Sequence, residues 1–181
     1  MKKLLPKISE KDLAVIKSLR MRSLYVWLAT WFGSGFLRPA PGTWGSLAAL
    51  PFGLLLLVFT NTFALIAAIC SVTIIGYWAA HEFEKDSGVH DSKMIVIDEV
   101  AGQWLSMLPL SLYSTLNAPL FPAYIVLSFI FFRFFDIIKP WPASIFDKKI
   151  NGALGVMGDD IIAGLYAALI LTGLIYYAGS G

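Results

Sequence analysis

The chain has 181 residues, of which 57% are hydrophobic, and its 14 basic and 12 acidic residues give a net charge of only +2. Charged residues make up 14% of the chain, whereas a soluble domain carries about 25%. These values exclude an ordinary soluble domain and give no support for nucleic-acid binding. The runs 39–80, 100–132 and 161–181 contain no charged residue. Because a membrane-spanning helix needs about 20 mostly apolar residues, we expect several spans.

The N-terminal part predicts a region at the membrane surface. Residues 7–23 place apolar and basic side chains at helical spacing, which is typical of an amphipathic helix on an anionic leaflet. A solvated basic arm is the alternative. Residues 24–37 are apolar and aromatic but too short for a confident crossing, so we expect an interfacial or re-entrant segment. We therefore divide the chain into a basic N-terminal helix at 1–23 and a single membrane domain at 24–181.

The rest of the chain predicts an all-α bundle with about five transmembrane helices. The expected spans lie near 44–60, 62–81, 95–113, 120–138 and 160–178, with polar turns at 60–62 and 114–119. Five antiparallel crossings put the N-terminus and the charged loops 82–93 and 139–158 on one side. The positive-inside rule places that side in the cytoplasm.

Acidic residues inside or at the edge of membrane spans are costly and usually functional. Five are expected on the charged side: Asp98, Glu99, Asp136, Asp159 and Asp160. The two adjacent pairs open the third and fifth spans, and Asp136 closes the fourth. Capping by the helix dipole is the alternative, but it explains neither adjacent pairs nor an Asp at a helix C-terminus. Hard oxygen ligands without a thiol cluster predict a Mg²⁺ site rather than a zinc site.

Two basic residues, Arg133 and Lys139, flank Asp136 in the sequence. Arg133 and Asp136 are three residues apart and so share a helix face, and Lys139 follows at the helix end. A local Arg–Asp ion pair is one interpretation. The other is an anion site beside the metal, because the planar guanidinium of arginine matches the geometry of phosphate.

Two further segments carry candidate residues. Thr43 and Ser46 follow a glycine-rich stretch at the start of the first span, where free backbone N–H groups can bind a phosphate; an ordinary helix cap is the alternative. His90 and Asp91 in the loop 82–93 could transfer protons, although a lone loop histidine is more often only solvated. Carboxylates, cations and a glycine-rich helix start at one membrane face suit Mg²⁺-assisted chemistry on a phosphate ester, and a substrate reaching that face is expected to be a lipid.

Five ordered sequence blocks carry a family resemblance. They are GSG at 33–35 with PGTWGSLAALP at 41–51, KDSGVHD at 85–91, IVIDEVAGQW at 95–104, FRFFDIIKPWP at 132–142, and FD at 146–147 with GVMGDD at 155–160. The chain thereby resembles the phosphatidylglycerophosphatase A family of bacterial lipid phosphatases.

The resemblance implies a multi-pass inner-membrane enzyme that hydrolyses phosphatidylglycerophosphate to phosphatidylglycerol and phosphate with Mg²⁺. It implies metal ligands among the five acidic residues and phosphate contacts at Arg133 and Lys139. Asp98, Asp136 and Asp159 are also catalytic candidates, together with His90 and Asp91. The nucleophile is either a water molecule or one of the aspartates.

Four other functions are alternatives to this one. A CDP-alcohol phosphotransferase would need a long aspartate signature that is missing. A histidine-type lipid phosphatase would need a Ser-Gly-His block and a later Arg and His pair, which His81 and His90 do not provide. A phosphatase acting on another membrane lipid phosphate stays open. A divalent-cation transporter is disfavoured because the expected carboxylates lie at helix ends and residues 161–181 contain none.

Overall fold

The computed structural model describes residues 10–113 and 119–179, apart from the side chain of Lys11, and these residues form helices, turns and loops without a strand. The elements in chain order are α1 (Glu10–Ser18), α2 (Leu24–Ala29), the 3-10 turn η1 (Ser34–Phe36), α3 (Pro41–Phe59), α4 (Thr62–Ser87), α5 (Ile97–Leu112), α6 (Phe121–Ile138), α7 (Ala143–Lys149) and α8 (Ala153–Gly179). The predicted all-α class is confirmed for this part of the chain.

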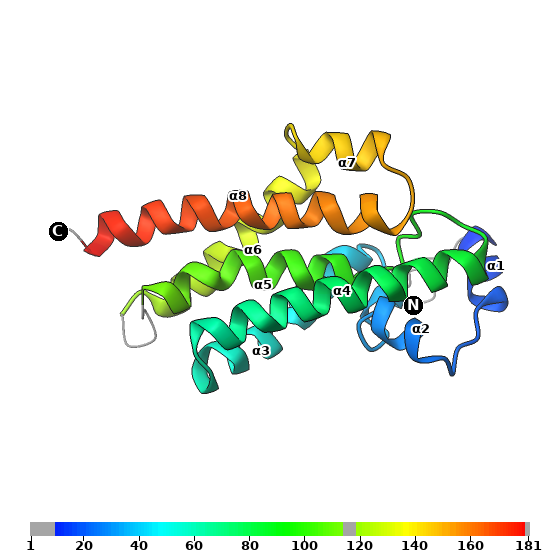
Figure 1. Ribbon diagram of the computed structural model, residues 1–181, viewed down its shortest axis with the longest axis horizontal. Helices are drawn as coiled ribbons and strands as arrows, with labels where there is room; N and C mark the ends of the chain where they lie inside the picture. Colours follow the sequence, from blue (N-terminus) through cyan, green and yellow to red (C-terminus); the bar gives the residue numbers. More distant parts are fainter. Residues whose placement is uncertain (1–9, 114–118, 180–181) are drawn as a thin grey trace, which may run out of the picture.

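Helix α5 lies at the centre of the long helices. It contacts α3, α4, α6 and α8, and α4, α5 and α8 follow the long dimension of the molecule (Figure 1). Eleven of its sixteen residues are buried, so its polar side chains must find partners inside the protein. The Gln103 amide accordingly donates to the hydroxyl groups of Ser106 and of Ser128 on α6, at 3.1 and 3.3 Å.

Four helices are long and apolar enough to cross a membrane, namely α3, α4, α6 and α8. The chain is thus a multi-pass membrane protein by helix composition. Four of the five expected spans correspond to these helices. The expected span near 95–113 corresponds to α5, which has only sixteen residues and does not reach the length of the other four. The predicted connection at 114–119 lies outside the described residues except for Pro119.

Both charged segments that we expected to be loops are partly helical. Helix α4 continues to Ser87 and ends at Gly88, whose φ of 67° suits the left-handed position after a helix. Helix α7 occupies part of 139–158, and α8 begins at Ala153 instead of residue 160. Asp159 and Asp160 therefore lie in the second turn of α8 and do not open it. The glycines that suggested a loop serve close packing: a Cβ at Gly158 would overlap the Phe146 ring of α7.

The N-terminal segment packs on the bundle. The helix predicted over 7–23 is observed only as α1, because residues 19–23 form an irregular segment of turns and bends and residues 7–9 lie outside the described part. Val15 and Leu19 are buried while Lys17 is exposed, and α1 contacts α4. Arg38 forms an ion pair with Asp12 at 2.8 Å, which ties α1 to the segment before α3. Residues 24–37 form only α2 and η1, and their interfacial or re-entrant position stays a prediction.

Candidate active site

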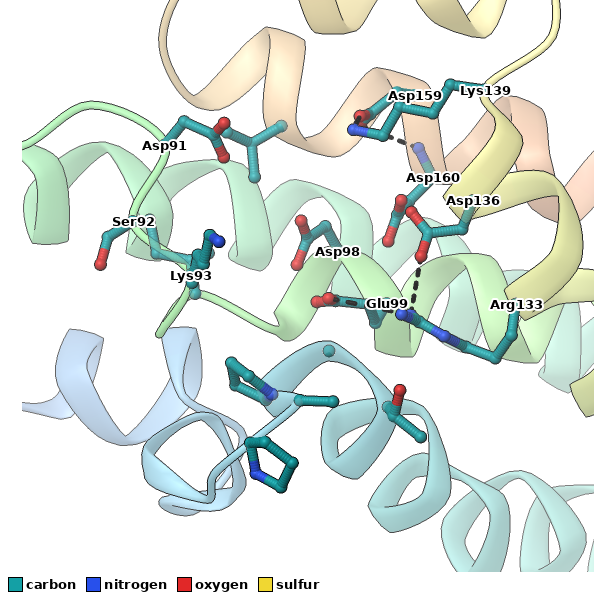
Figure 2. A pocket seen from close by; sticks show the side chains of 17 residues that line it. Asp91, Ser92, Lys93, Asp98, Glu99, Arg133, Asp136, Lys139, Asp159 and Asp160 are labelled. Atoms are coloured by element: carbon teal, nitrogen blue, oxygen red, sulfur yellow. Dashed lines mark hydrogen bonds and ion pairs between the residues drawn. The ribbon is translucent and has the colours of Figure 1, made fainter. Parts of the chain in front are cut away.

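A cavity of about 350 Å³ opens where α3, α5 and α8 begin and α6 ends. It is lined by nine of the eleven residues predicted for the site: Thr43, Asp91, Asp98, Glu99, Arg133, Asp136, Lys139, Asp159 and Asp160. Figure 2 shows the side chains of α5, α6 and α8 converging on this space. Residues from five separate sequence blocks therefore line one cavity, and their roles stay predictions.

Three carboxylates form the centre of the cavity. Asp98, Glu99 and Asp160 each offer one oxygen, and these three oxygens all lie within 4.8 Å of one another. Asp98 is 8% exposed and Asp160 only 2% exposed. One buried oxygen on each of the three has no hydrogen-bond partner. Because close, buried carboxylates repel one another, and unpartnered buried oxygens are costly, this arrangement is suited to holding a cation.

A glycine lets α3 approach this cluster. A Cβ on Gly42, in the first turn of α3, would overlap the Oε1 atom of Glu99. Pro41 stands at the first position of the helix, where its fixed φ is favourable and its missing N–H is not needed. The Pro-Gly-Thr sequence thus starts the helix at Pro41 and leaves room for the Glu99 carboxylate at Gly42.

Arg133 connects the carboxylates to α3. Its Nη1 atom lies 2.8 Å from Asp136 and 4.0 Å from Glu99, and it donates to the Ser46 hydroxyl at 3.3 Å. Ser46 in turn donates to the Gly42 carbonyl at 2.9 Å. Ser46 does not line the cavity, so the structure places it behind Arg133 and leaves Thr43 facing the open space. Both the predicted ion pair and a cation beside the acidic cluster are present.

Lys139 joins three elements at the upper edge of the cavity in Figure 2. Its ammonium group donates to Asp147 of α7 and to Asp159 of α8, each at 2.5 Å. Burial alone would lower the pKa of Lys139, but the hydrogen bonds to these two carboxylates raise it well above the usual value. Lys139 therefore stays charged over the whole physiological range. Two of the five predicted metal ligands, Asp136 and Asp159, are thus paired with cations.

The structure places His90 and Asp91 at different distances from the centre of the main cavity. Both residues line a neighbouring cavity of about 70 Å³ beside α7 and α8, but only Asp91 also lines the main cavity. The His90 side chain is 81% exposed, and its Nδ1 atom lies 3.7 Å from Glu84. Glu84 is buried and accepts the backbone N–H of Asp91 at 2.8 Å. Asp91 therefore belongs to the main site, and His90 lies at its margin.

Sequence reasoning missed several residues of this site: Glu84, Ser92, Lys93 and Asp147. Ser92 and Lys93 line the main cavity, and Asp147 holds Lys139. Glu84 follows Ala80 by one helical turn and therefore lies on the same, buried face of α4. A helix pattern continued to Glu84 would have indicated this buried position. The expected span ends at residue 81, whereas α4 continues to Ser87, so the prediction placed Glu84 in a loop. Lys93 had no periodic signal, because it lies in an irregular segment.

Comparison with known proteins gives consistent matches. A family model described as phosphatidylglycerophosphatase A matches residues 27–175. A phosphatidylglycerophosphatase A of Haemophilus influenzae is 37% identical over 83% of this chain and 88% of its own length. The Escherichia coli protein of that name is 36% identical over 93% of this chain and 91% of its own length.

A third relative carries a different description. A Bacteroides thetaiotaomicron protein described as a candidate phosphatidylinositol-3-phosphatase is 35% identical over 82% of this chain and 91% of its own length. No solved structure gives a significant match. All three relatives are bacterial and bear the names of lipid phosphatases, but their names differ in the headgroup.

Proposed function

We propose, because the chain belongs to the phosphatidylglycerophosphatase A family, that it removes the terminal phosphate of phosphatidylglycerophosphate and leaves phosphatidylglycerol. The observation that supports this best is the cavity itself. It combines three buried carboxylates carrying unpartnered oxygens with Arg133 and Lys139. Such a combination suits a phosphomonoester, which needs cations around its oxygens and a site for the metal.

We propose Mg²⁺ as the metal and Asp98, Glu99 and Asp160 as the residues that hold it. The donor set fits, because it consists of carboxylate oxygens, which Mg²⁺ prefers, and because one buried oxygen of each residue lacks a partner. When bound, Mg²⁺ would neutralise charge on the phosphate oxygens. Asp136 and Asp159 remain predicted ligands, although their pairing with Arg133 and Lys139 favours a role in holding those two cations.

The other residues act on the phosphate and the leaving group. Arg133 lies beside Glu99 and offers N–H donors to the phosphate oxygens, and Thr43 faces the same cavity from the start of α3. Hydrolysis breaks the bond between phosphorus and the glycerol oxygen, which must gain a proton. The water consumed in the hydrolysis supplies that proton, and we assign its transfer to Asp91, because Asp91 lines the main cavity and His90 does not.

We also propose that α5 is a fifth crossing and that the cavity faces the cytoplasm. Helix α5 lies within the bundle beside α4 and α8 (Figure 1), so the surrounding helices shield it from lipid and it can be shorter than they are. The cytoplasmic face follows from the positive-inside rule applied to five crossings. As the resemblance to the family implies, we propose that the membrane is the bacterial inner membrane.

Phosphate release by the purified protein tests the activity. In uncharged detergent micelles, we expect release from phosphatidylglycerophosphate with Mg²⁺ and none after chelation. Phosphatidylinositol 3-phosphate and phosphatidic acid serve as competing substrates, because one relative is named for a phosphoinositide. A preference for phosphatidylinositol 3-phosphate would replace the proposed substrate, and no release from any of the three would contradict the proposal.

Isotope labelling tests for one route through an aspartyl phosphate. A single turnover in ¹⁸O-water, with enzyme in excess, puts the label into released phosphate if water attacks phosphorus, either in the lipid or in an aspartyl phosphate. If an aspartate attacks first and water then cleaves the acyl phosphate at its carbonyl carbon, the label enters the protein carboxylate. Mass spectrometry of the peptides containing Asp98, Asp136 and Asp159 reads out the second route.

A further inference from the structure

Three cationic side chains line the cavity, and two of them are already engaged. Arg133 is paired with Asp136, and Lys139 with Asp147 and Asp159. The ammonium group of Lys93 makes no ion pair or hydrogen bond with any residue that the structure describes. Figure 2 shows Lys93 across the cavity from the two engaged cations. A ligand would therefore meet Lys93 without breaking an existing contact.

The backbone around Lys93 is fixed while its side chain is free. Its neighbours Ser92 and Met94 are buried, whereas Lys93 itself is exposed. The Ile95 N–H donates to the Ser92 carbonyl at 2.9 Å, and the Val96 N–H donates to a carbonyl of α2 at 2.8 Å. Glu84 holds the chain on the other side through Asp91. Lys93 is thus presented to the cavity from a rigid segment, which lowers the entropic cost of binding.

The proposed substrate carries two phosphates, and only the terminal one is cleaved. The terminal phosphomonoester must reach the carboxylate cluster and Arg133, where it is cleaved. The phosphodiester that joins it to diacylglycerol keeps its negative charge and lies one glycerol away. A cavity of about 350 Å³ is near the lower end of the roughly 300–1,000 Å³ typical of small-molecule sites, so it suits a headgroup and leaves the acyl chains outside.

We propose that Lys93 binds the phosphodiester of the lipid and is thereby a specificity-determining residue. This rests on the proposed function, since it assumes a substrate with two phosphates. Arg133 and Lys139 are held beside the acidic cluster, so the second phosphate meets the third cation. Lys93 then favours lipids that carry both a phosphodiester and a terminal phosphate over those with a phosphomonoester alone.

Binding of the product isolates this contact, because short-chain phosphatidylglycerol carries the phosphodiester and no phosphomonoester. We would measure its affinity for the purified protein by thermal shift in uncharged detergent, a readout that needs no turnover, with inorganic phosphate as the second ligand. The variants are Lys93→Ala, Lys93→Arg and the control Lys85→Ala. Lys85 is 69% exposed and lies outside the cavity, so the control removes the same charge elsewhere.

We expect Lys93→Ala to weaken phosphatidylglycerol binding about tenfold, as expected for one charge-assisted hydrogen bond. The affinity for inorganic phosphate should stay within about twofold, and Lys93→Arg and Lys85→Ala should resemble the wild type. Unchanged phosphatidylglycerol binding, or an equal loss for both ligands, would overturn the role of Lys93. A Lys93-dependent affinity in a protein that releases no phosphate would instead contradict the proposed function alone.

Discussion

Gly102 of α5 and Gly164 of α8 pack backbone against backbone. A Cβ on Gly164 would lie 2.5 Å from the carbonyl oxygen of Gly102, so only glycine allows this approach. The two helices both begin at the cavity and run in the same direction (Figure 1). One helical turn before each glycine stand Asp98 and Asp160, which belong to the acidic cluster. The glycine contact therefore sets how close these two carboxylates lie.

Gly164→Ala should separate α5 from α8 and pull Asp160 away from Asp98. We expect a loss of activity of about tenfold or more and a lower melting temperature, because overpacking costs about 1–3 kcal/mol. Gly173→Ala is the matched control on the same helix, since a Cβ there meets nothing within 4 Å. The control should keep full activity with an equal or higher melting temperature, because alanine favours helix. Identical behaviour of the two variants would contradict this role of the glycine contact.

Asp160→Asn should change the response of the protein to Mg²⁺. Without metal, the variant is expected to melt at a higher temperature than the wild type, because one of three mutually repelling carboxylates is removed. With Mg²⁺, the wild type should be stabilised by ligand binding and the variant much less. Thermal unfolding across a Mg²⁺ titration measures both effects, with Glu82→Gln outside the cavity as the control. If Mg²⁺ raised the melting temperature of Asp160→Asn as much as that of the wild type, Asp160 would not be a metal ligand.

The sequence predicts α3, α5 and α6 closely, because apolar runs bounded by polar turns define where a helix can cross a membrane. It also predicts the pairing of Arg133 with Asp136, since a spacing of three residues fixes a shared helix face. The start of α8 is different. Its glycines lower helix propensity and suggest a loop, whereas contact with α7 stabilises the helix there. Only the tertiary structure contains that information.

The irregular segment between α4 and α5 is the second part of the structure that the sequence does not predict. The contact between Glu84 and the Asp91 N–H depends on the left-handed backbone of Asp91, with a φ of 51°. A non-glycine residue rarely adopts that conformation, so no periodic pattern predicts it. The exposure of Lys93 toward the cavity follows from the same local path. Asp91 was found as a candidate from the sequence, but Ser92 and Lys93, which the same turn places, were missed. Glu84 and Asp147 were missed for another reason: they lie on the end of α4 and on α7, which were expected to be loops.

Arg133→Ala should lower both stability and activity. The change leaves Asp136 and Glu99 without their cation in a largely buried position, and such a loss costs about 3 kcal/mol or more. The double variant Arg133→Ala with Asp136→Ala should regain much of the melting temperature, because the unpaired charge is gone, but no activity. Recovery of activity in the double variant would show that Arg133 serves only to neutralise Asp136.

Two variants can show whether Lys139 acts through its ion pairs within the protein or through contact with the substrate. Asp147→Asn weakens one of its two ion pairs but keeps the ammonium at the cavity, so we expect activity within about threefold of the wild type, given the modest value of partly exposed pairs. Lys139→Ala removes the cation and should reduce activity more than tenfold, roughly the effect of one charged contact. Steady-state kinetics and melting temperatures compare the two. Equal losses of activity in the two variants would mean that Lys139 acts by joining α7 to α8 and does not contact the substrate.

Glu84 is expected to act as a positioning residue for the segment that carries Asp91 and Lys93. Glu84→Ala removes the acceptor of the Asp91 N–H, so the segment loses its anchor to α4. We expect a several-fold higher KM for phosphatidylglycerophosphate, since a freer segment pays more entropy on binding. The Mg²⁺-dependent thermal shift should stay unchanged, because the carboxylate cluster is held by α5 and α8.

Glu84→Gln provides the rescue, because its amide oxygen can accept the same N–H without the charge. It should restore a KM close to that of the wild type, and Glu82→Ala, on the same helix but outside the cavity, should have no effect. A raised KM in Glu84→Gln would mean that the charge matters, through His90 at 3.7 Å. A normal KM in Glu84→Ala would show that the contacts of Ser92, Ile95 and Val96 hold the segment without Glu84.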